Sequence, residues 1–258
     1  MQQVKHGLNS GKKAFFASDF HLGLALHDEP SEALREGRII RWLDTIEPDA
    51  GAVFLLGDIF DFWHEYRHVV PKGNIRLLGK LATMSDNGIP IYFFPGNHDM
   101  WMKDYFVKEL GAIVYHNPVE WSVNNKKLML GHGDGLGPGD PYYKLLKHGV
   151  FNNPVARFLY KWLHPDIGIS LAKTWSAGTR AQKLGTSESF LGNGEYLVQY
   201  CKKMEEKDHY DFYVFGHRHL PIDFAINDIS RYINLGEWIS QFNYGIFDGN
   251  NFRLEKFE

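Results

Sequence analysis

Residues Ala52–Asp61 have the sequence Ala-Val-Phe-Leu-Leu-Gly-Asp-Ile-Phe-Asp, in which an unbroken apolar run ends in a glycine and two carboxylates. A continuous apolar run of this kind is typical of a parallel strand that is covered on both faces. Asp58 and Asp61 then lie where the strand ends and a loop begins. Ligands bind at this edge in layered α/β domains, so the stretch predicts both the fold class and the place of a site.

Four further segments repeat this arrangement of an apolar run followed by polar side chains. They are Asp19-Phe20-His21, Gly96-Asn97-His98-Asp99, Gly131-His132-Gly133-Asp134 and Gly216-His217-Arg218-His219. A single histidine after a strand is usually a core residue, and a single aspartate there is often a turn cap. Five such segments in one chain instead indicate a single metal centre that is assembled from distant parts of the sequence.

Seven side chains from these segments are candidate metal ligands: Asp19, His21, Asp58, Asn97, His132, His217 and His219. The set mixes oxygen and nitrogen donors and contains no thiolate, which favours manganese, iron or zinc over a soft metal. The pairs Asp19/His21 and His217/His219 are expected on extended segments, where residues two apart point to the same side. One histidine of such a pair can then serve each of two neighbouring metals, with Asp58 as the shared ligand. A glycine before four of the ligands lets backbone segments approach closely.

The composition is that of an ordinary globular protein, with 258 residues, 44% of them hydrophobic and 23% charged. The formal net charge of −3 excludes a strongly basic surface, so no nucleic-acid partner is expected, and no protein partner is implied. Cys201 is the only cysteine, which excludes an internal disulfide and favours a reducing compartment. Residues 1–13 lack the apolar centre of a secretory signal, and no apolar run is long enough to span a bilayer, so a cytoplasmic protein is expected.

The order of the predicted elements indicates two packed sheets. Strands at Ala14–Ala17, Ala52–Leu56 and Ile89–Phe94 alternate with helices at Ser31–Asp44 and Asn74–Ser85. The remaining predicted elements are strands at Glu120–Val123, Lys127–Leu130, Asp211–Phe215, Pro221–Ile226, Arg231–Leu235, Gln241–Phe247 and Asn251–Phe257, and a helix within Glu195–Lys207. We therefore predict an α/β (α+β) fold, a sandwich of two mixed sheets with flanking helices.

Residues 135–194 do not fit this sandwich. They are bounded by glycine-rich segments and contain helical patterns rich in aromatic and basic residues. One interpretation is a helical subdomain that buries its own apolar face. The other is a cap that is inserted between core segments 1–134 and 195–258 and covers the strand ends where the candidate metal ligands lie. Such a cap would offer an apolar groove and cations to an anionic amphiphile. The candidates for groove or membrane contact are Phe151, Phe158, Trp162 and Trp175.

The five segments resemble the signature of the calcineurin-like metallophosphoesterases, which is D-x-H, G-D-x-x-D, G-N-H-D, G-H and G-H-x-H in this order. The resemblance implies a four-layer sandwich and two divalent ions, manganese before iron or zinc. One metal would be held by Asp19, His21, Asp58 and His219, and the other by Asp58, Asn97, His132 and His217. His98 would stabilise or protonate the leaving oxygen and would be oriented by Asp99, while Asp61 and Asp134 would orient metal ligands.

The chain is also similar to one branch of that family, the UDP-2,3-diacylglucosamine diphosphatases of lipid A biosynthesis. The similarity includes Gly57-Asp58-Ile59-Phe60-Asp61-Phe62-Trp63 and Asn234-Leu235-Gly236-Glu237-Trp238. It implies hydrolysis of this nucleotide-lipid to UMP and 2,3-diacylglucosamine 1-phosphate by an enzyme bound peripherally at the cytosolic face of the inner membrane. The implied substrate-binding residues are Asn97, His98, Asp140, Tyr143, Ser176, Arg180, Lys183 and His217.

Two positions depart from that branch, since many of its members have arginine in place of His98, and Arg180 stands where asparagine is expected. Both departures affect the expected identity of the substrate and not the expected metal site. One alternative is a metallophosphoesterase that acts on a soluble nucleotide or a phosphoprotein, and the aromatic, basic insertion argues against it. A second alternative is a scaffold that keeps the fold without catalysis, and the complete set of seven ligands argues against it.

Overall fold

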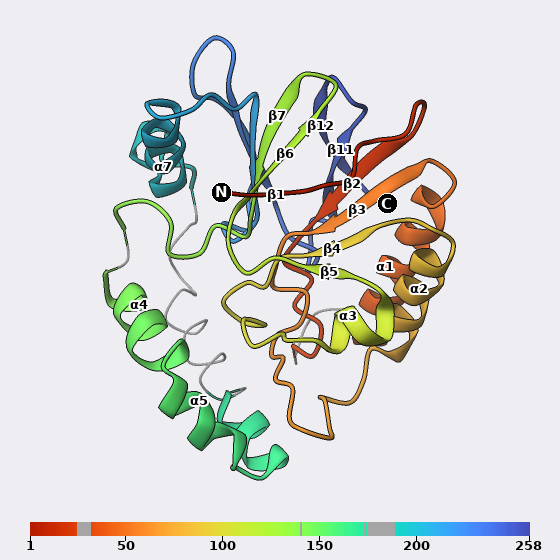
Figure 1. The fold of residues 1–258 in the computed structure, drawn as a ribbon, viewed down its shortest axis with the longest axis vertical. Coiled ribbons are helices and arrows are strands. Elements are labelled where there is room, and N and C mark those ends of the chain that lie inside the picture. Colours follow the sequence, from red (N-terminus) through yellow and green to blue (C-terminus); the bar gives the residue numbers. More distant parts are fainter. Residues whose placement is uncertain (25–31, 140, 173, 175–188) are drawn as a thin grey trace.

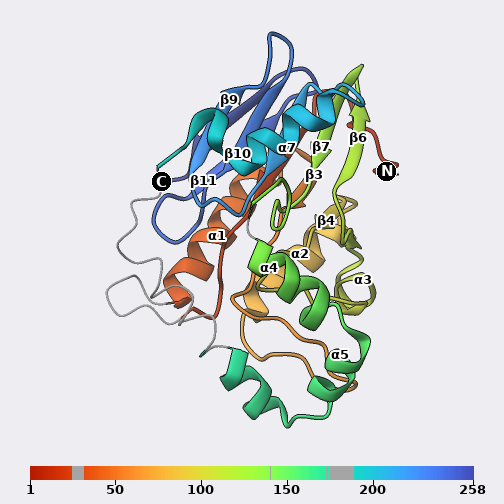
Figure 2. The same cartoon turned by 90° about the vertical axis from the view of Figure 1, so that its left-hand side faces the viewer.

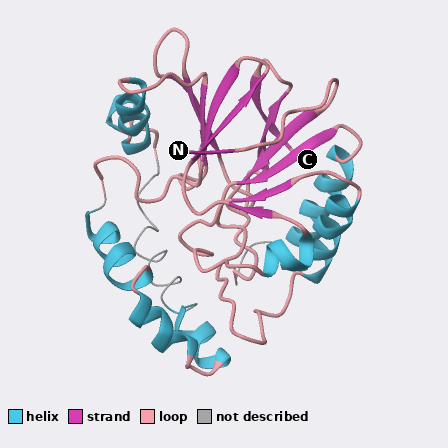
Figure 3. Cartoon of the chain, viewed as in Figure 1, coloured by secondary structure: helices cyan, strands magenta, loops and turns pink. Residues whose placement is uncertain are grey.

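Two six-stranded mixed sheets lie face to face in the computed structural model (Figure 1 and Figure 3), which describes residues 1–24, 32–139, 141–172, 174 and 189–258. The first sheet contains β2 (Lys13–Ala17), β3 (Ala50–Leu55), β4 (Ile91–Phe93), β5 (Ile113–Val114), β11 (Asn243–Phe247) and β12 (Phe252–Lys256), in the order β12-β11-β2-β3-β4-β5. The second contains β1 (Gln2–Gln3), β6 (Val119–Val123), β7 (Lys126–Leu130), β8 (Phe212–Phe215), β9 (Pro221–Ala225) and β10 (Arg231–Leu235), in the order β1-β6-β7-β8-β10-β9.

Helices cover the outer face of each sheet and complete four layers. The first sheet is covered by α1 (Glu32–Ile46), α2 (Ile75–Asp86) and α3 (Tyr105–Leu110), and the second by α7 (Tyr196–Glu205), which a short turn at Gly192–Gly194 precedes. Trp42 and Phe93 belong to the buried cluster under α1–α3, Phe16 and Trp121 to the cluster between the sheets, and Cys201 to the cluster under α7. The predicted four-layer sandwich is therefore confirmed.

All five polar segments follow strands, as the sequence predicts. The strands before them are β2, β3 and β4, which are parallel neighbours in the first sheet, and β7 and β8, which are parallel neighbours in the second. The carboxyl ends of parallel strands open on the same edge of a sheet. This topology brings segments from opposite ends of the chain to one place.

The structure also shows where sequence patterns are weakest. Asn124 and Asn125 have φ angles of 50° and 62° and join β6 to β7 in an antiparallel hairpin, as predicted. In contrast, β1, β5 and α3 have no counterpart in the prediction. The first two contain only two residues each, which is too short for a periodic pattern.

The described helical residues between 141 and 172, called the insertion below, form a row of helices beside the sandwich (Figure 2). The insertion contains α4 (Pro141–Leu146), a π-helical turn at Lys147–Phe151 and α5 (Pro154–Lys161), and residues 165–172 are also helical. Neither α4 nor α5 has a buried residue, so within the described residues these two helices do not bury an apolar face of their own. No helix in the described part of the chain combines the length and apolarity that crossing a membrane requires.

The aromatic residues of the insertion differ in exposure. Phe158 and Trp162 are 59% and 76% exposed, and their contact with a groove or membrane stays a prediction. Phe151 is only 7% exposed, because its ring packs against Trp101 of the core with the ring centroids 6.2 Å apart. Phe151 is therefore a packing residue in this structure and not part of an exposed surface. Trp175 lies outside the described residues.

Candidate metal centre

The loops after the strands hold most of the ligand candidates in the left-handed backbone region. The φ angles are 56° for Asp19, 46° for His21, 53° for Asp58, 72° for His217 and 53° for His219. A non-glycine residue in this region costs about 1–3 kcal/mol and persists where the surrounding structure enforces it. The expectation that the two pairs lie on extended segments is therefore wrong. Their side chains converge because the chain turns at each member of a pair.

One group of converging side chains consists of Asp19, His21, Asp58 and His219, whose ligand atoms lie within 4.8 Å of one another. His219 Nε2 lies 3.1 Å from Asp19 Oδ1 and 3.2 Å from His21 Nε2. His21 Nε2 lies 3.8 Å from Asp58 Oδ2. These four side chains are the set that the resemblance assigns to one metal.

A second group consists of Asp58, His132 and His217, with Asn97 beside it. His132 Nε2 lies 3.3 Å from Asp58 Oδ2. Asn97 Oδ1 lies 3.4 Å from His132 Nε2 and 3.0 Å from His217 Nδ1. Asp58 Oδ2 thus faces both groups, and the structure brings all seven candidates together.

Buried charges of opposite sign dominate the electrostatics of the site. Burial opposes protonation of His21 and His132, but the nearby carboxylates outweigh it and raise their pKa values to about 9 and about 10. Burial opposes ionisation of Asp58, but the surrounding imidazoles hold its pKa well below the usual range. Burial and the charge on His132 lower the pKa of His217 to about 3. Protons on His21 and His132 thus balance the carboxylates, and a divalent cation can take their place.

The donor set fits a divalent metal. Asp19 Oδ1 is buried and lies 3.1 Å from His219 Nε2 and 3.8 Å from His21 Nε2. The imidazole nitrogens of His21 and His219 face each other across 3.2 Å, with no thiolate in either group. Oxygen and imidazole nitrogen together suit manganese, iron or zinc.

His98 lies at the exposed edge of the centre. Its Nδ1 is 3.1 Å from the backbone oxygen of Asp61 and 3.4 Å from Asp61 Oδ1. The same Oδ1 is 3.5 Å from His21 Nδ1, and the rings of His21 and His98 are perpendicular, with centroids 4.8 Å apart. A single buried carboxylate therefore faces both a ligand candidate and the predicted catalytic histidine.

Comparison with known proteins now identifies the family. The model of the family described as calcineurin-like phosphoesterase matches residues 13–221. The chain belongs to this family. It is 38% identical to a UDP-2,3-diacylglucosamine hydrolase of Porphyromonas gingivalis, over 95% of this chain and 98% of that protein. UDP-2,3-diacylglucosamine hydrolases of Proteus mirabilis and Ectopseudomonas mendocina are 26% and 27% identical, over 80% and 85% of this chain and 81% and 90% of theirs.

Membership of the family confirms the predicted resemblance and makes the chain a metal-dependent hydrolase. Within this phosphoesterase, Asp99 fixes the loop that carries Asp58. Its buried carboxylate accepts hydrogen bonds from the backbone amides of Gly96 at 2.7 Å, Ile59 at 2.8 Å, and Asp58 and Phe60 at 3.3 Å each. The sequence predicts that Asp99 orients His98. These contacts show that Asp99 also binds the backbone of the Asp58 loop, a role that no sequence pattern indicated.

Two glycines of the phosphoesterase leave room for its ligands. A Cβ at Gly96 would lie 2.3 Å from Asp58 Oδ1 and 2.7 Å from His132 Nε2. A Cβ at Gly216 would lie 2.6 Å from Asp19 Oδ2. All three distances are below van der Waals contact, so the close backbone approach predicted at these glycines is confirmed.

Asp134 connects the metal centre with the insertion. Its carboxylate accepts a hydrogen bond from the Tyr143 hydroxyl at 2.6 Å and forms an ion pair with Lys147 at 2.5 Å. The sequence predicted roles for Asp134 and Tyr143 but not for Lys147. The signal that could have indicated Lys147 is its spacing of four residues from Tyr143. The other predicted cap contacts, Asp140, Ser176, Arg180 and Lys183, lie outside the described residues.

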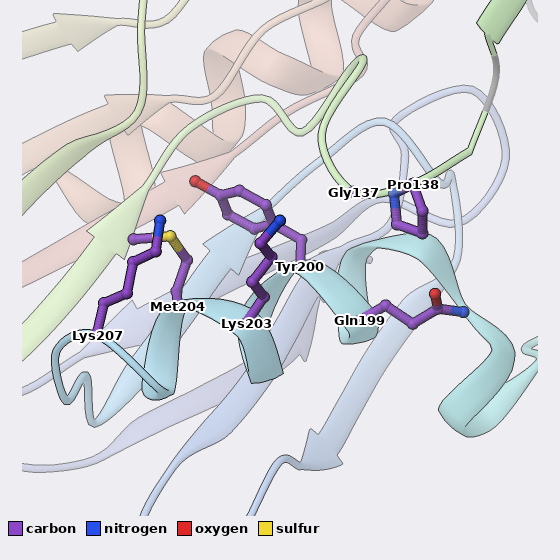
Figure 4. A pocket seen from close by; sticks show the side chains of 7 residues that line it. All are labelled: Gly137, Pro138, Gln199, Tyr200, Lys203, Met204 and Lys207. Carbon is purple, nitrogen blue, oxygen red and sulfur yellow. The ribbon is translucent and has the colours of Figure 1, made fainter.

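A separate hollow of about 430 Å³ lies between α7 and the loop at Gly137 and Pro138 (Figure 4). The helix contributes Gln199, Tyr200, Lys203 and Met204 to its lining, and Lys207 in the turn after the helix also lines it. None of the seven ligand candidates lines it, so the hollow is distinct from the metal centre.

Proposed function

We propose that this phosphoesterase hydrolyses the pyrophosphate bond of UDP-2,3-diacylglucosamine and releases UMP and 2,3-diacylglucosamine 1-phosphate. Water adds to one phosphorus, and the bond from that phosphorus to the bridging oxygen breaks. The substrate follows from the 38% identity to the P. gingivalis hydrolase over nearly the whole length of both chains. The convergence of seven oxygen and nitrogen donors, which includes both predicted ligand sets, supports the reaction class.

The metal assignment is part of this proposal. Asp19, His21, Asp58 and His219 hold one ion, and Asp58, Asn97, His132 and His217 hold the other. Manganese is the expected metal, with iron and zinc as alternatives. When bound, the two ions supply Lewis-acid activation of water and neutralise charge on the attacked phosphate. The protein's own part is to hold the ligands in place. It does so through the strained loops and through the hydrogen bonds that backbone amides donate to the Asp99 carboxylate.

His98 is the proposed group that contacts the leaving oxygen. Asp61 faces its Nδ1, which leaves Nε2 to donate a hydrogen bond or a proton to the oxygen that departs. The His98 side chain is 19% exposed, so the substrate can reach it without displacing a buried ligand.

Replacing His98 with alanine should lower kcat by about 10²–10⁴-fold, which is the usual contribution of general acid catalysis. Metal content should stay near the wild-type value, because His98 belongs to neither proposed ligand set. Steady-state kinetics and elemental analysis of the same preparation test this prediction. Loss of one metal equivalent would show that His98 is a ligand.

Residues 135–194 are the proposed cap, with Asp140, Tyr143, Ser176, Arg180 and Lys183 as substrate contacts beside Asn97, His98 and His217. The ion pair of Asp134 with Lys147 and the hydroxyl of Tyr143 hold α4 next to the loop that carries His132. Substrate phosphates bound under α4 therefore lie close to the metal centre.

The exposed side of α5 is the proposed contact with the cytosolic membrane surface that contains the substrate. Phe158 and Leu159 of α5 and Trp162 just after it are between 59% and 76% exposed, with Arg157 next to Phe158 and Lys161 next to Trp162 in the sequence. An apolar face flanked by cations is typical of helices that lie in the interface of an anionic bilayer.

The double substitution Phe158→Ser and Trp162→Ser should weaken binding to vesicles that contain anionic lipid by at least about tenfold. Each ring that is removed takes away about 1.5–3 kcal/mol of the favourable free energy of burial in the bilayer. Ile75→Ser is the matched control, since Ile75 is 79% exposed on α2 of the core. Co-sedimentation with vesicles measures the effect. Equal binding of the double variant and the control would contradict membrane contact through α5.

Product analysis tests the proposed reaction directly. The purified protein is incubated with Mn²⁺ and UDP-2,3-diacylglucosamine in detergent, and the phosphorus-containing products are resolved. We expect equal amounts of UMP and 2,3-diacylglucosamine 1-phosphate. If the protein hydrolyses a chromogenic phosphodiester but not this lipid, the metal chemistry stands and the substrate assignment is wrong.

A further inference from the structure

A cluster of aromatic rings joins the loops of the metal centre to α5 of the insertion. We call it the aromatic cluster, and it consists of His64, Tyr66, Trp101, Phe151 and Tyr160. His64 lies three residues after Asp61, and Trp101 lies two residues after Asp99. The cluster therefore begins where the second and third metal-binding loops end.

Ring contacts run from both loops to Tyr160 of α5. The centroid of Tyr160 lies 5.0 Å from that of His64 and 4.8 Å from that of Trp101, and the rings of His64 and Trp101 are 5.4 Å apart. The backbones at His64 and Trp101 also pair through an isolated β-bridge. Rings packed on two sides of Tyr160 restrict how α5 can shift relative to the loops.

Two hydrogen bonds extend the aromatic cluster along the insertion. Trp101 donates from Nε1 to the backbone oxygen of Phe151 at 3.1 Å, just before α5 begins. Tyr160 donates from its hydroxyl to the backbone oxygen of Gly168 at 2.6 Å. A Cβ at Gly168 would lie 2.5 Å from the Tyr66 hydroxyl, so the helical segment 165–172 also packs closely against the cluster. The cluster thus contacts the insertion on both sides of α5.

His64 lies at the centre of these contacts, which its ring makes with Tyr160 and Trp101. It is 3% exposed, and its Nδ1 has no hydrogen-bond partner among the described residues. Burial and the cations Lys103, Arg157 and Lys161 lower its pKa to about 4, so the ring is neutral at pH 7. A phenyl ring would fill similar space, so the contacts of His64 with Tyr160 and Trp101 depend on the shape of the ring and not on its charge.

We propose that His64 is a positioning residue that, through Tyr160 and Trp101, fixes α5 relative to the metal centre and so determines the affinity for a long amphiphilic substrate. The inference rests on the proposed function for the identity of that substrate. A substrate that extends from the metals onto α5 needs the metal centre and α5 to be held at a fixed distance and orientation. A small phosphodiester that reaches only the metals does not.

Kinetics of His64→Ala and His64→Phe in the manganese-loaded protein test this inference. We expect His64→Ala to raise KM for UDP-2,3-diacylglucosamine about tenfold with little change in kcat, in line with mutations that alter coupling between sites. Its kcat/KM for bis(p-nitrophenyl) phosphate should stay within about twofold of wild type. His64→Phe keeps the ring contacts and should restore most of the affinity for the lipid. Equal losses on both substrates, or no change on either, would overturn the inference.

Hydrogen–deuterium exchange without substrate provides a second readout. We expect faster exchange in residues 154–161 of His64→Ala and unchanged exchange in β3, with wild-type rates restored in His64→Phe. Unchanged exchange in α5 of His64→Ala would overturn the positioning role. If the wild-type protein does not hydrolyse UDP-2,3-diacylglucosamine, the proposed function fails, and the exchange rates of α5 still decide whether His64 positions the insertion.

Discussion

Replacement of Asp58 with alanine should abolish hydrolysis and remove metal from both proposed sites. Asp58 Oδ2 lies 3.3 Å from His132 Nε2 and 3.8 Å from His21 Nε2, so the substitution takes a ligand from each group. A metal contributes several kcal/mol of transition-state stabilisation, so we expect kcat/KM to fall by at least about 10³-fold. Elemental analysis and hydrolysis of a chromogenic phosphodiester measure the two effects.

The backbone at Asp58 requires a second variant. Its φ of 53° is tolerated by asparagine but strained for alanine, so alanine alone would combine loss of a ligand with a change in the loop. Asp58→Asn keeps the shape of the side chain and removes the charge, and it should also lose metal and most activity. Asp49→Ala is the surface control, since Asp49 is a half-exposed carboxylate paired only with Lys13 among the described contacts. Near-native activity in Asp58→Asn would contradict the shared-ligand assignment.

The sequence predicted the features that depend on local patterns. Apolar runs such as Ala52–Leu56 mark buried strands, and the polar residues after them mark strand ends, so the sequence predicted that the seven ligand candidates lie at strand ends. The asparagine pair at the β6–β7 turn is equally local, because asparagine tolerates positive φ. These features require no knowledge of which distant residues are in contact.

The features that sequence did not predict depend on such distant contacts. The left-handed backbone at Asp19 and His21 is enforced by the neighbouring loops, since the amide of Asp19 bonds to the oxygen of Gly57 and that of His21 to the oxygen of Asp58. Likewise, the ring contacts of His64 with α5 join residues 96 positions apart in the chain. A periodic pattern reports the environment of its own element and carries no information on such pairs.

Replacement of Asp99 with alanine should destabilise the protein more than any other single substitution at the centre. Four backbone amides, three of them from Asp58–Phe60 and one from Gly96, donate to this carboxylate in a buried position. Removal of the acceptor leaves them without a partner, at about 1–3 kcal/mol for each amide that water cannot reach. Allowing for relaxation of the loop, we expect a loss of about 3–5 kcal/mol and a Tm lower by about 10 °C.

Thermal unfolding of Asp99→Ala with and without Mn²⁺ distinguishes two roles for this residue. If Asp99 fixes the loop that carries Asp58, both forms lose stability, and the stabilisation that metal provides also becomes smaller, because the ligand is no longer held in place. Asp99→Asn keeps one acceptor oxygen and should fall between wild type and alanine. If Asp99 acted only on His98, Asp99→Ala would melt within about 2 °C of wild type while kcat fell, since a catalytic contact alone adds little to folding.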